Sequence, residues 1–172
     1  MIVNRLLKRF ARASFPAALI LFSATAAVEA GSPMLQNLQS GEFSSVDDYS
    51  QSDKWLIVMI WAHDCQVCER EVDDYHRFHQ RHAENDALVL GITLDGDERK
   101  PQALEFVARH GLGFDNLIGE PEAVMAYYQI ATGSRWVGTP SFLIFGPDGE
   151  LKAKQAGAVE VEIVENFIAQ SQ

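Results

Sequence analysis

The chain contains two cysteines, and they lie three positions apart as Cys65 and Cys68. Two thiols at that spacing can close into a disulfide and reopen, which is the chemistry of dithiol–disulfide exchange. As a structural crosslink the pair would add little stability, because its loop is very short and the stabilisation grows with loop length. The sequence holds no further cysteine to complete a four-thiolate zinc site. The pair therefore predicts redox chemistry.

The elements around the pair predict which thiol reacts. An apolar run from Trp55 to Trp61 has the length of a strand buried on both faces, and it ends shortly before Cys65. Apolar residues then recur at helical spacing to about His82, which places Cys65 near the first turn of a helix. Unpaired backbone N–H groups and the helix dipole favour a thiolate there. Cys65 is the predicted nucleophile, and Cys68, one turn on and partly covered, is expected to resolve the mixed disulfide.

The rest of the chain predicts an α/β fold. Residues 87–94 form a second buried strand, which closes a strand–helix–strand unit with parallel pairing and a right-handed crossover. Residues 31–54 are polar and are expected to form a hairpin or an irregular lead-in. The remaining expected elements are a helix over 101–111, a strand over 114–118, a helix over 121–130, strands over 141–145 and 150–155 joined by a turn, and a helix over 159–169. The result is a mixed sheet flanked by helices, with a terminal antiparallel hairpin.

The first thirty residues read as a targeting segment. Four basic residues precede an apolar stretch over 15–22, and small residues at Val28 and Ala30 suit cleavage after Ala30. The apolar run is short for a membrane span, so a signal peptide is predicted, with an uncleaved N-terminal anchor as the alternative. Residues 31–172 are expected to form one domain facing an extracytoplasmic compartment such as the periplasm.

The charge balance bears on partners. The chain has 14 Lys and Arg against 24 Asp and Glu, a formal net charge of −10. Four of the basic residues lie within residues 1–30, so the remainder is still more acidic. Such a surface disfavours nucleic acid and anionic lipid as partners.

Three segments together resemble a known family. They are residues 61–71 around the cysteine pair, residues 137–144, which contain Gly138-Thr139-Pro140, and the turn Pro147-Asp148-Gly149. Over roughly residues 35–170 the chain resembles the TlpA/ResA-like branch of the thioredoxin superfamily. The resemblance implies a thioredoxin-like fold and a thiol–disulfide oxidoreductase that needs no cofactor beyond its cysteines. It also implies a reductive direction, a disulfide-containing protein substrate such as apocytochrome c, and a membrane thiol reductant as electron donor.

The resemblance also implies roles for particular residues. Pro140 would be cis and lie beside the cysteine pair, with a trans proline at a strand start as the alternative. Thr139 would present its backbone to an extended substrate segment, and Trp61 is expected at the same substrate-binding surface. Glu71 would exchange protons with Cys68, one turn before it on the helix, the alternative being an ordinary solvated glutamate.

The chain departs from the family pattern at three positions. Asp64 stands where the family usually has Trp, and Val67 where it usually has Pro. The negative charge of Asp64 opposes ionisation of Cys65 and is expected to make the disulfide less oxidising. Asp73 replaces a family proline, which puts the usual kink of that helix in doubt.

Parts of the sequence are also compatible with two other function classes. His63 with Cys65 and Cys68 could form a soft Cu(I) site, which would make the protein a metallochaperone. Copper chaperones of this fold typically carry CxxxC, however, and the three helical histidines at 76, 79 and 82 drift around their helix, so no metal is expected. A thiol peroxidase is disfavoured because Ala62 stands where that class typically has Thr.

Overall fold

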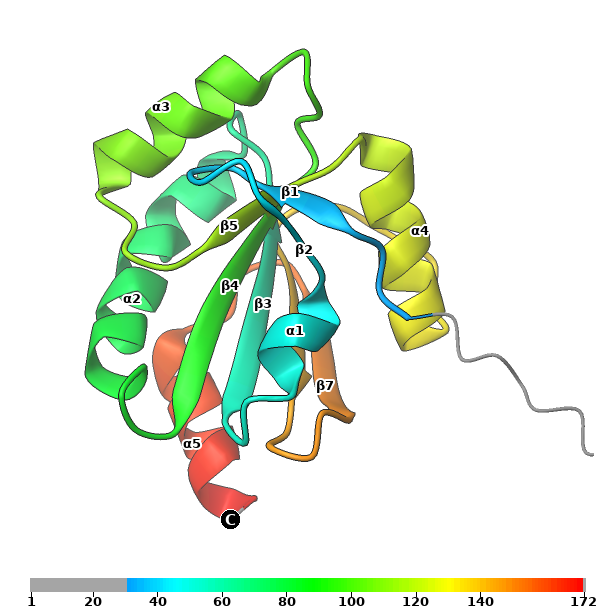
Figure 1. Cartoon of the computed structure of the whole chain (residues 1–172). Coiled ribbons are helices and arrows are strands. Elements are labelled where there is room, and N and C mark those ends of the chain that lie inside the picture. Colours follow the sequence, from blue (N-terminus) through cyan, green and yellow to red (C-terminus); the bar gives the residue numbers. More distant parts are fainter. Residues whose placement is uncertain (1–30, 172) are drawn as a thin grey trace, which may run out of the picture. The chain divides into compact units, whose positions relative to one another are not determined.

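The computed structural model describes residues 31–171, so the predictions for residues 1–30 lie outside it. It contains seven strands and five helices in the described range (Figure 1). In chain order these are β1 (Leu35–Asn37), β2 (Phe43–Ser44), α1 (Val46–Ser50), β3 (Trp55–Trp61), α2 (Gln66–His82), β4 (Ala87–Thr93), α3 (Lys100–His110), β5 (Asn116–Ile118), α4 (Pro121–Thr132), β6 (Ser141–Phe145), β7 (Leu151–Ala156) and α5 (Val161–Gln170).

The strands form one mixed sheet in the order β2-β1-β5-β4-β3-β6-β7. β3 and β4 pair in parallel, as do β4 and β5, whereas β6 runs antiparallel to β3 and to β7. The predicted α/β class, strand–helix–strand unit and terminal hairpin are thus confirmed. The predicted lead-in hairpin is present as the antiparallel pair β1 and β2, and β1 also pairs antiparallel with β5, which joins the hairpin to the central sheet.

The central strand β3 supplies both faces of the core. Its residues alternate across the sheet, and all seven are buried. Trp55, Ile57, Met59 and Trp61 pack with residues of α2, α3 and α5, whereas Leu56, Val58 and Ile60 pack with residues of α1 and α4. Figure 1 shows the same two layers of helices on opposite faces of the sheet. The continuous apolar run in the sequence reflects this burial on both faces.

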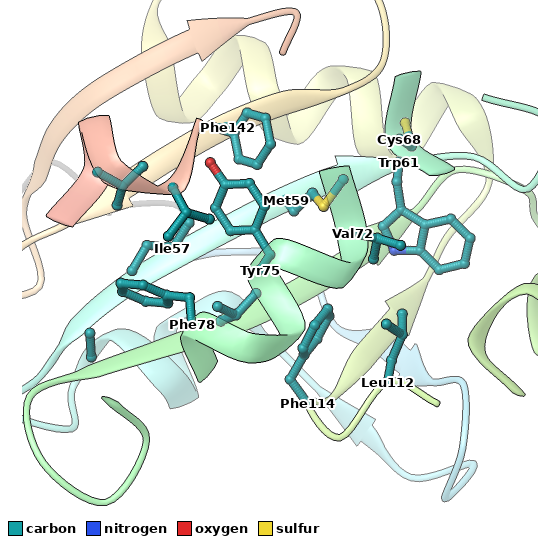
Figure 2. Packing of buried hydrophobic residues seen from close by; sticks show 14 of the residues in the cluster. Ile57, Met59, Trp61, Cys68, Val72, Tyr75, Phe78, Leu112, Phe114 and Phe142 are labelled. Carbon is teal, nitrogen blue, oxygen red and sulfur yellow. The ribbon is translucent and has the colours of Figure 1, made fainter. Parts of the chain in front are cut away.

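The α2 face of the core includes Cys68, the second cysteine of the pair (Figure 2). Cys68, Val72 and Tyr75 of α2 have no exposed surface, and Tyr75 stacks on Phe142 of β6 with ring centroids 4.7 Å apart. Residues 66–82 are helical throughout, including Asp73. None of the helices among residues 31–171 is long and apolar enough to cross a membrane.

Candidate active site

Cys65 and Cys68 form a disulfide, with their Cα atoms 5.2 Å apart. Cys65 is the N-cap of α2, and its Sγ accepts the backbone N–H of Cys68 at 3.1 Å. Cys65 is partly exposed, whereas Cys68 has no exposed surface. The sulfur of Cys65 therefore lies where the unpaired N–H groups of a helix start favour negative charge, and solvent can reach it.

Pro140 lies at the same end of the sheet. The Thr139–Pro140 peptide bond is cis. Ser141, the first residue of β6, pairs with Ile60 of β3, so Pro140 is level with Trp61 at the strand end that leads into the cysteine turn. A proline at a strand start does not interrupt the ladder. Pro140 is buried and Thr139 is partly exposed.

The segment between β7 and α5, residues 157–160, is tied to this region at three points. Gly157 N–H donates to Pro140 O at 2.9 Å. The backbone of Val159 is held on both sides: its N–H donates to Glu71 Oε2 at 2.8 Å, and its carbonyl accepts the hydroxyl of Tyr75 at 2.9 Å. Burial, with the nearby charge of Glu71, raises the pKa of Tyr75, so the hydroxyl remains a donor. The partly buried Glu71 thus joins α2 to the 157–160 segment, a contact that the sequence did not indicate.

Trp61 has a different place from the one expected. Its side chain has no exposed surface and stacks on Phe106 of α3, with ring centroids 4.5 Å apart. Its indole N–H donates to Asn116 Oδ1 at 3.1 Å within the core. Trp61 therefore cannot contact a substrate directly. Its side chain packs the end of β3 against the core.

Sequence reasoning missed a buried carboxylate beside the site, Asp95. β3 and β4 are parallel, and Trp61 pairs with Thr93 at their carboxyl ends. The residues that follow each of these by two positions therefore lie close together. These residues are His63 and Asp95: His63 Nδ1 lies 2.6 Å from Asp95 Oδ1, and His63 N–H donates to Asp95 Oδ2 at 2.9 Å. The Asp95 side chain is 2% exposed. The signal was present, because both residues follow predicted strands whose carboxyl ends share one edge of a parallel sheet.

The helical histidines are engaged in the fold. His76 Nδ1 accepts the N–H of Gly113 at 3.1 Å, and His79 Nδ1 accepts the N–H of Val89 at 3.1 Å. Burial lowers the pKa of His79, which suits an imidazole that acts as an acceptor. Among residues 31–171, no three His, Cys, Asp or Glu side chains are grouped so as to hold a metal ion.

The mixed sheet, the cysteine pair at the start of α2 and the cis-proline before β6 together define a thioredoxin-like domain with a dithiol–disulfide centre. The chain belongs to the AhpC/TSA family, whose sequence profile matches residues 28–154. No curated protein sequence matches the chain.

Solved structures with the same fold include several named as thiol–disulfide oxidoreductases or their homologues. A thiol:disulfide interchange protein of the thioredoxin family from Chlorobium tepidum TLS is 18% identical with a TM-score of 0.68, covering 82% of this chain and 93% of its own. A DsbF homologue from Corynebacterium diphtheriae is 20% identical with a TM-score of 0.69, covering 81% and 84%. A secreted Mycobacterium tuberculosis disulfide oxidoreductase homologous to E. coli DsbE is 18% identical with a TM-score of 0.62, covering 80% and 96%. These comparisons confirm the thioredoxin-like resemblance inferred from the sequence.

Proposed function

We propose that this protein is an exported thiol–disulfide oxidoreductase that reduces disulfides of extracytoplasmic proteins. The observation that carries the proposal is the asymmetry of the cysteine pair. Cys65 is partly exposed at the start of α2 and its sulfur accepts a helix N–H, whereas Cys68 is fully buried. A thiolate at Cys65 can reach a substrate disulfide, and the protected Cys68 can then attack only the mixed disulfide that forms next to it.

Thr139 and Pro140 are proposed to hold the substrate chain. They precede β6 at the strand end that leads into the cysteine turn, and Thr139 is partly exposed. An extended substrate segment could pair with the Thr139 backbone as an added strand, which would align its disulfide with Cys65. Val137, 70% exposed just before this loop, offers an apolar contact for the same segment.

Glu71 is proposed as the proton partner of Cys68. It follows Cys68 by one helical turn, and it is partly buried. The Val159 N–H donates to Glu71 Oε2 at 2.8 Å, and this hydrogen bond holds the carboxylate in place. A carboxylate held on that face of the helix can accept the Cys68 proton when this thiol attacks the mixed disulfide.

The proposal also includes the direction of disulfide exchange and the compartment in which the protein works. The reductive direction is taken from the family resemblance, and the exposed charge of Asp64 beside Cys65 adds a small effect in the same direction. Export is supported by the targeting pattern of residues 1–30 and by the secreted M. tuberculosis protein of the same fold. The partners would be a disulfide-containing protein, for example an apocytochrome c during its maturation, and a membrane thiol reductant that regenerates the dithiol.

The test is insulin reduction by the purified protein, compared with Cys65→Ser and Cys68→Ser. Both variants should lose turnover. Cys68→Ser should accumulate mixed disulfides with a disulfide-containing protein, and Cys65→Ser should not. Limiting iodoacetamide should modify Cys65 first in the reduced protein. His82→Gln, altered at the far end of α2, is the matched control and should behave as wild type. A reduction potential near about −270 mV would support the reductive direction, and one near about −120 mV would contradict it.

Other outcomes would assign the site to a different class. Tight Cu(I) binding that disappears in His63→Ala, with no insulin reduction by the wild type, would make this a copper-handling protein. Rapid consumption of hydrogen peroxide without exchange of protein disulfides would make it a thiol peroxidase, the class in which Ala62 is atypical. Preferential labelling of Cys68 would reverse the roles of the two cysteines.

A further inference from the structure

His63 and Asp95 form a hydrogen-bonded pair at the entrance to the cysteine turn. The turn runs from Ala62 to Cys65 and is closed by the Cys65 N–H, which donates to Ala62 O at 3.1 Å. His63 lies within it, two positions before the nucleophile proposed above. Residues two positions apart have Cα atoms at most about 7 Å from each other. His63 and Cys65 thus belong to one four-residue turn, and a charge on the imidazole would act on the Cys65 sulfur across that turn.

Asp95 is fixed by several donors. Besides the two contacts from His63, its Oδ2 accepts the hydroxyl of Thr93 at 2.5 Å, and Arg99 Nε lies 3.6 Å from Oδ1. The carboxylate can only accept, so Nδ1 of His63 carries the proton in this contact, and Nε2 is the ring nitrogen with the lone pair. A carboxylate so placed sets the tautomer of the ring and fixes its orientation.

The chain has five histidines, all among the described residues, and His63 differs from the other four. His76 and His79 accept backbone N–H groups. His82 and His110 bind Asp86 and Asp73, whose side chains are 42% and 53% exposed. Only His63 is paired with a carboxylate that is buried, at 2% exposure, and it is also the histidine beside the cysteine turn.

We propose that His63 is the acid–base group of Cys65 and that Asp95 is its positioning residue, a role that rests on the thiol–disulfide exchange proposed above. In the reduced protein Cys65 gives its proton to His63 Nε2, which leaves a thiolate beside an imidazolium. The thiolate attacks one sulfur of the substrate disulfide, and that S–S bond breaks as the mixed disulfide forms. The leaving substrate thiolate takes the proton back from His63.

The second half of the reaction returns His63 to its starting state. Cys68 attacks the Cys65 sulfur and gives its proton to Glu71, the mixed disulfide breaks, and Glu71 passes the proton to the second substrate thiolate. Two protein thiols are oxidised to one disulfide, and one substrate disulfide is reduced to two thiols. His63 is unchanged at the end, because the proton it accepted has left with the first substrate thiol.

The other charges around His63 bear on its pH dependence. Asp95 and Arg99 come from the region that follows β4, and Asp64 is the next residue in the turn. Asp64 is exposed, so solvent screens its effect on Cys65. Arg99 also lies against Asp95, but 42% of its side chain is exposed, so it neutralises the charge of the carboxylate only in part. The exposed charge of Asp64 is therefore expected to act on Cys65 less strongly than a positive charge on His63 would.

The test is the rate of iodoacetamide alkylation of Cys65, measured from pH 5 to 9 in the reduced protein, with insulin reduction in parallel. Cys68→Ser provides the background, so that only Cys65 reacts. His63→Gln removes the titrating ring, and Asp95→Asn removes its carboxylate. Asp86→Asn is the matched control, because it removes the exposed carboxylate partner of His82 at the far end of α2. Circular dichroism checks that each variant is folded.

At pH 6 His63→Gln should react about three- to tenfold more slowly than its parent, the effect of losing one positive charge at this range. At pH 8.5, well above the ordinary titration range of an imidazole, the difference should fall below about twofold. Asp95→Asn should act in the same direction, Asp86→Asn should match the parent, and His63→Lys should restore the rate at pH 6. If Asp95→Asn does not fold, the two variants at the partly exposed His63 carry the test alone.

The results separate this proposal from the proposed function. A wild-type protein that reduces insulin, combined with pH curves for His63→Gln and its parent that coincide, would overturn the role of His63 and leave the exchange activity standing. An equal change in Asp86→Asn would overturn it as well, because the effect would not be local. A wild-type protein that reduces no disulfide, as inactive as Cys65→Ser, would remove the proposed function and this role with it.

Discussion

Gly91 of β4 lies where the core beneath the active site leaves no room for a side chain. It pairs with Met59 on one side and Asn116 on the other. A Cβ at position 91 would lie 1.9 Å from Asn116 Oδ1 and 2.9 Å from Trp61 Nε1. Asn116 cannot simply rotate away, because it has no exposed surface and binds at both ends of its amide. Oδ1 accepts the Trp61 indole N–H at 3.1 Å, and Nδ2 donates to Phe114 O at 2.9 Å.

Gly91→Ala should therefore break both hydrogen bonds of the Asn116 amide. Each buried polar group left without a partner costs about 1–3 kcal/mol. Replacing glycine lowers the entropy of the unfolded chain, which returns about 0.4–1 kcal/mol. The net loss in the free energy of unfolding is about 3 kcal/mol. For a domain of this size, that corresponds to a fall of roughly 10 °C in the melting temperature.

Urea unfolding followed by circular dichroism measures this loss. Gly113→Ala is the matched control: its Cβ would meet an imidazole carbon of His76 at 3.1 Å, and its cost should stay below about 1 kcal/mol. A double-mutant cycle with Asn116→Ala isolates the cause, because the alanine at 91 should cost far less once Oδ1 is absent. A loss below about 1 kcal/mol for Gly91→Ala, or an equal loss in both backgrounds, would refute the reasoning.

Three further predictions follow from contacts around the site. Tyr75→Phe leaves the carbonyl of Val159 without its buried donor and should lower the free energy of unfolding by about 1–2 kcal/mol in urea; an unchanged midpoint would show that water replaces the hydroxyl. Burial lowers the pKa of His79, so as the pH falls below the ordinary value of 6.5 the unfolded state takes up this proton first and stability declines. His79→Asn keeps an acceptor for Val89 without titrating, and its stability should fall less steeply between pH 7 and 5; equal slopes would contradict this. Asp64→Asn should raise the alkylation rate of Cys65 at pH 7 by less than about twofold because Asp64 is exposed; a larger rise would mean that its charge is poorly screened.

The central part of the fold could be predicted because its signals are local. The apolar run of β3 and the helical spacing of Val72, Tyr75 and Phe78 indicate burial without reference to distant residues. The N-cap position of Cys65 follows from the boundary between these two elements. β1 has only three residues, so the sequence indicated a hairpin in this region but not that β1 would also pair with β5 and join the central sheet.

The missed parts of the site depend on long-range pairing. Glu71 and Val159 are 88 positions apart, and His63 and Asp95 are 32 apart. To predict the first contact, one would need the position of the segment before α5. To predict the second, one would need the exact register of two parallel strands. The inward orientation of Trp61 likewise depends on which face of the sheet α2 and α3 cover. Sequence spacing alone fixes none of these relations.

The same separations determine when the site can assemble as the chain is made. The two cysteines are neighbours in sequence, so their thiols can meet in a chain that has not folded. Pro140 and Val159 emerge from synthesis long after them, and contacts between distant segments form slowly. A nascent chain that has reached residue 100 or so therefore carries an ordinary dithiol without its proline, its glutamate contact or a closed sheet. The C-terminal third of the protein supplies the contacts that surround the dithiol in the folded domain. A chain truncated before β6 should therefore react with protein disulfides without selectivity.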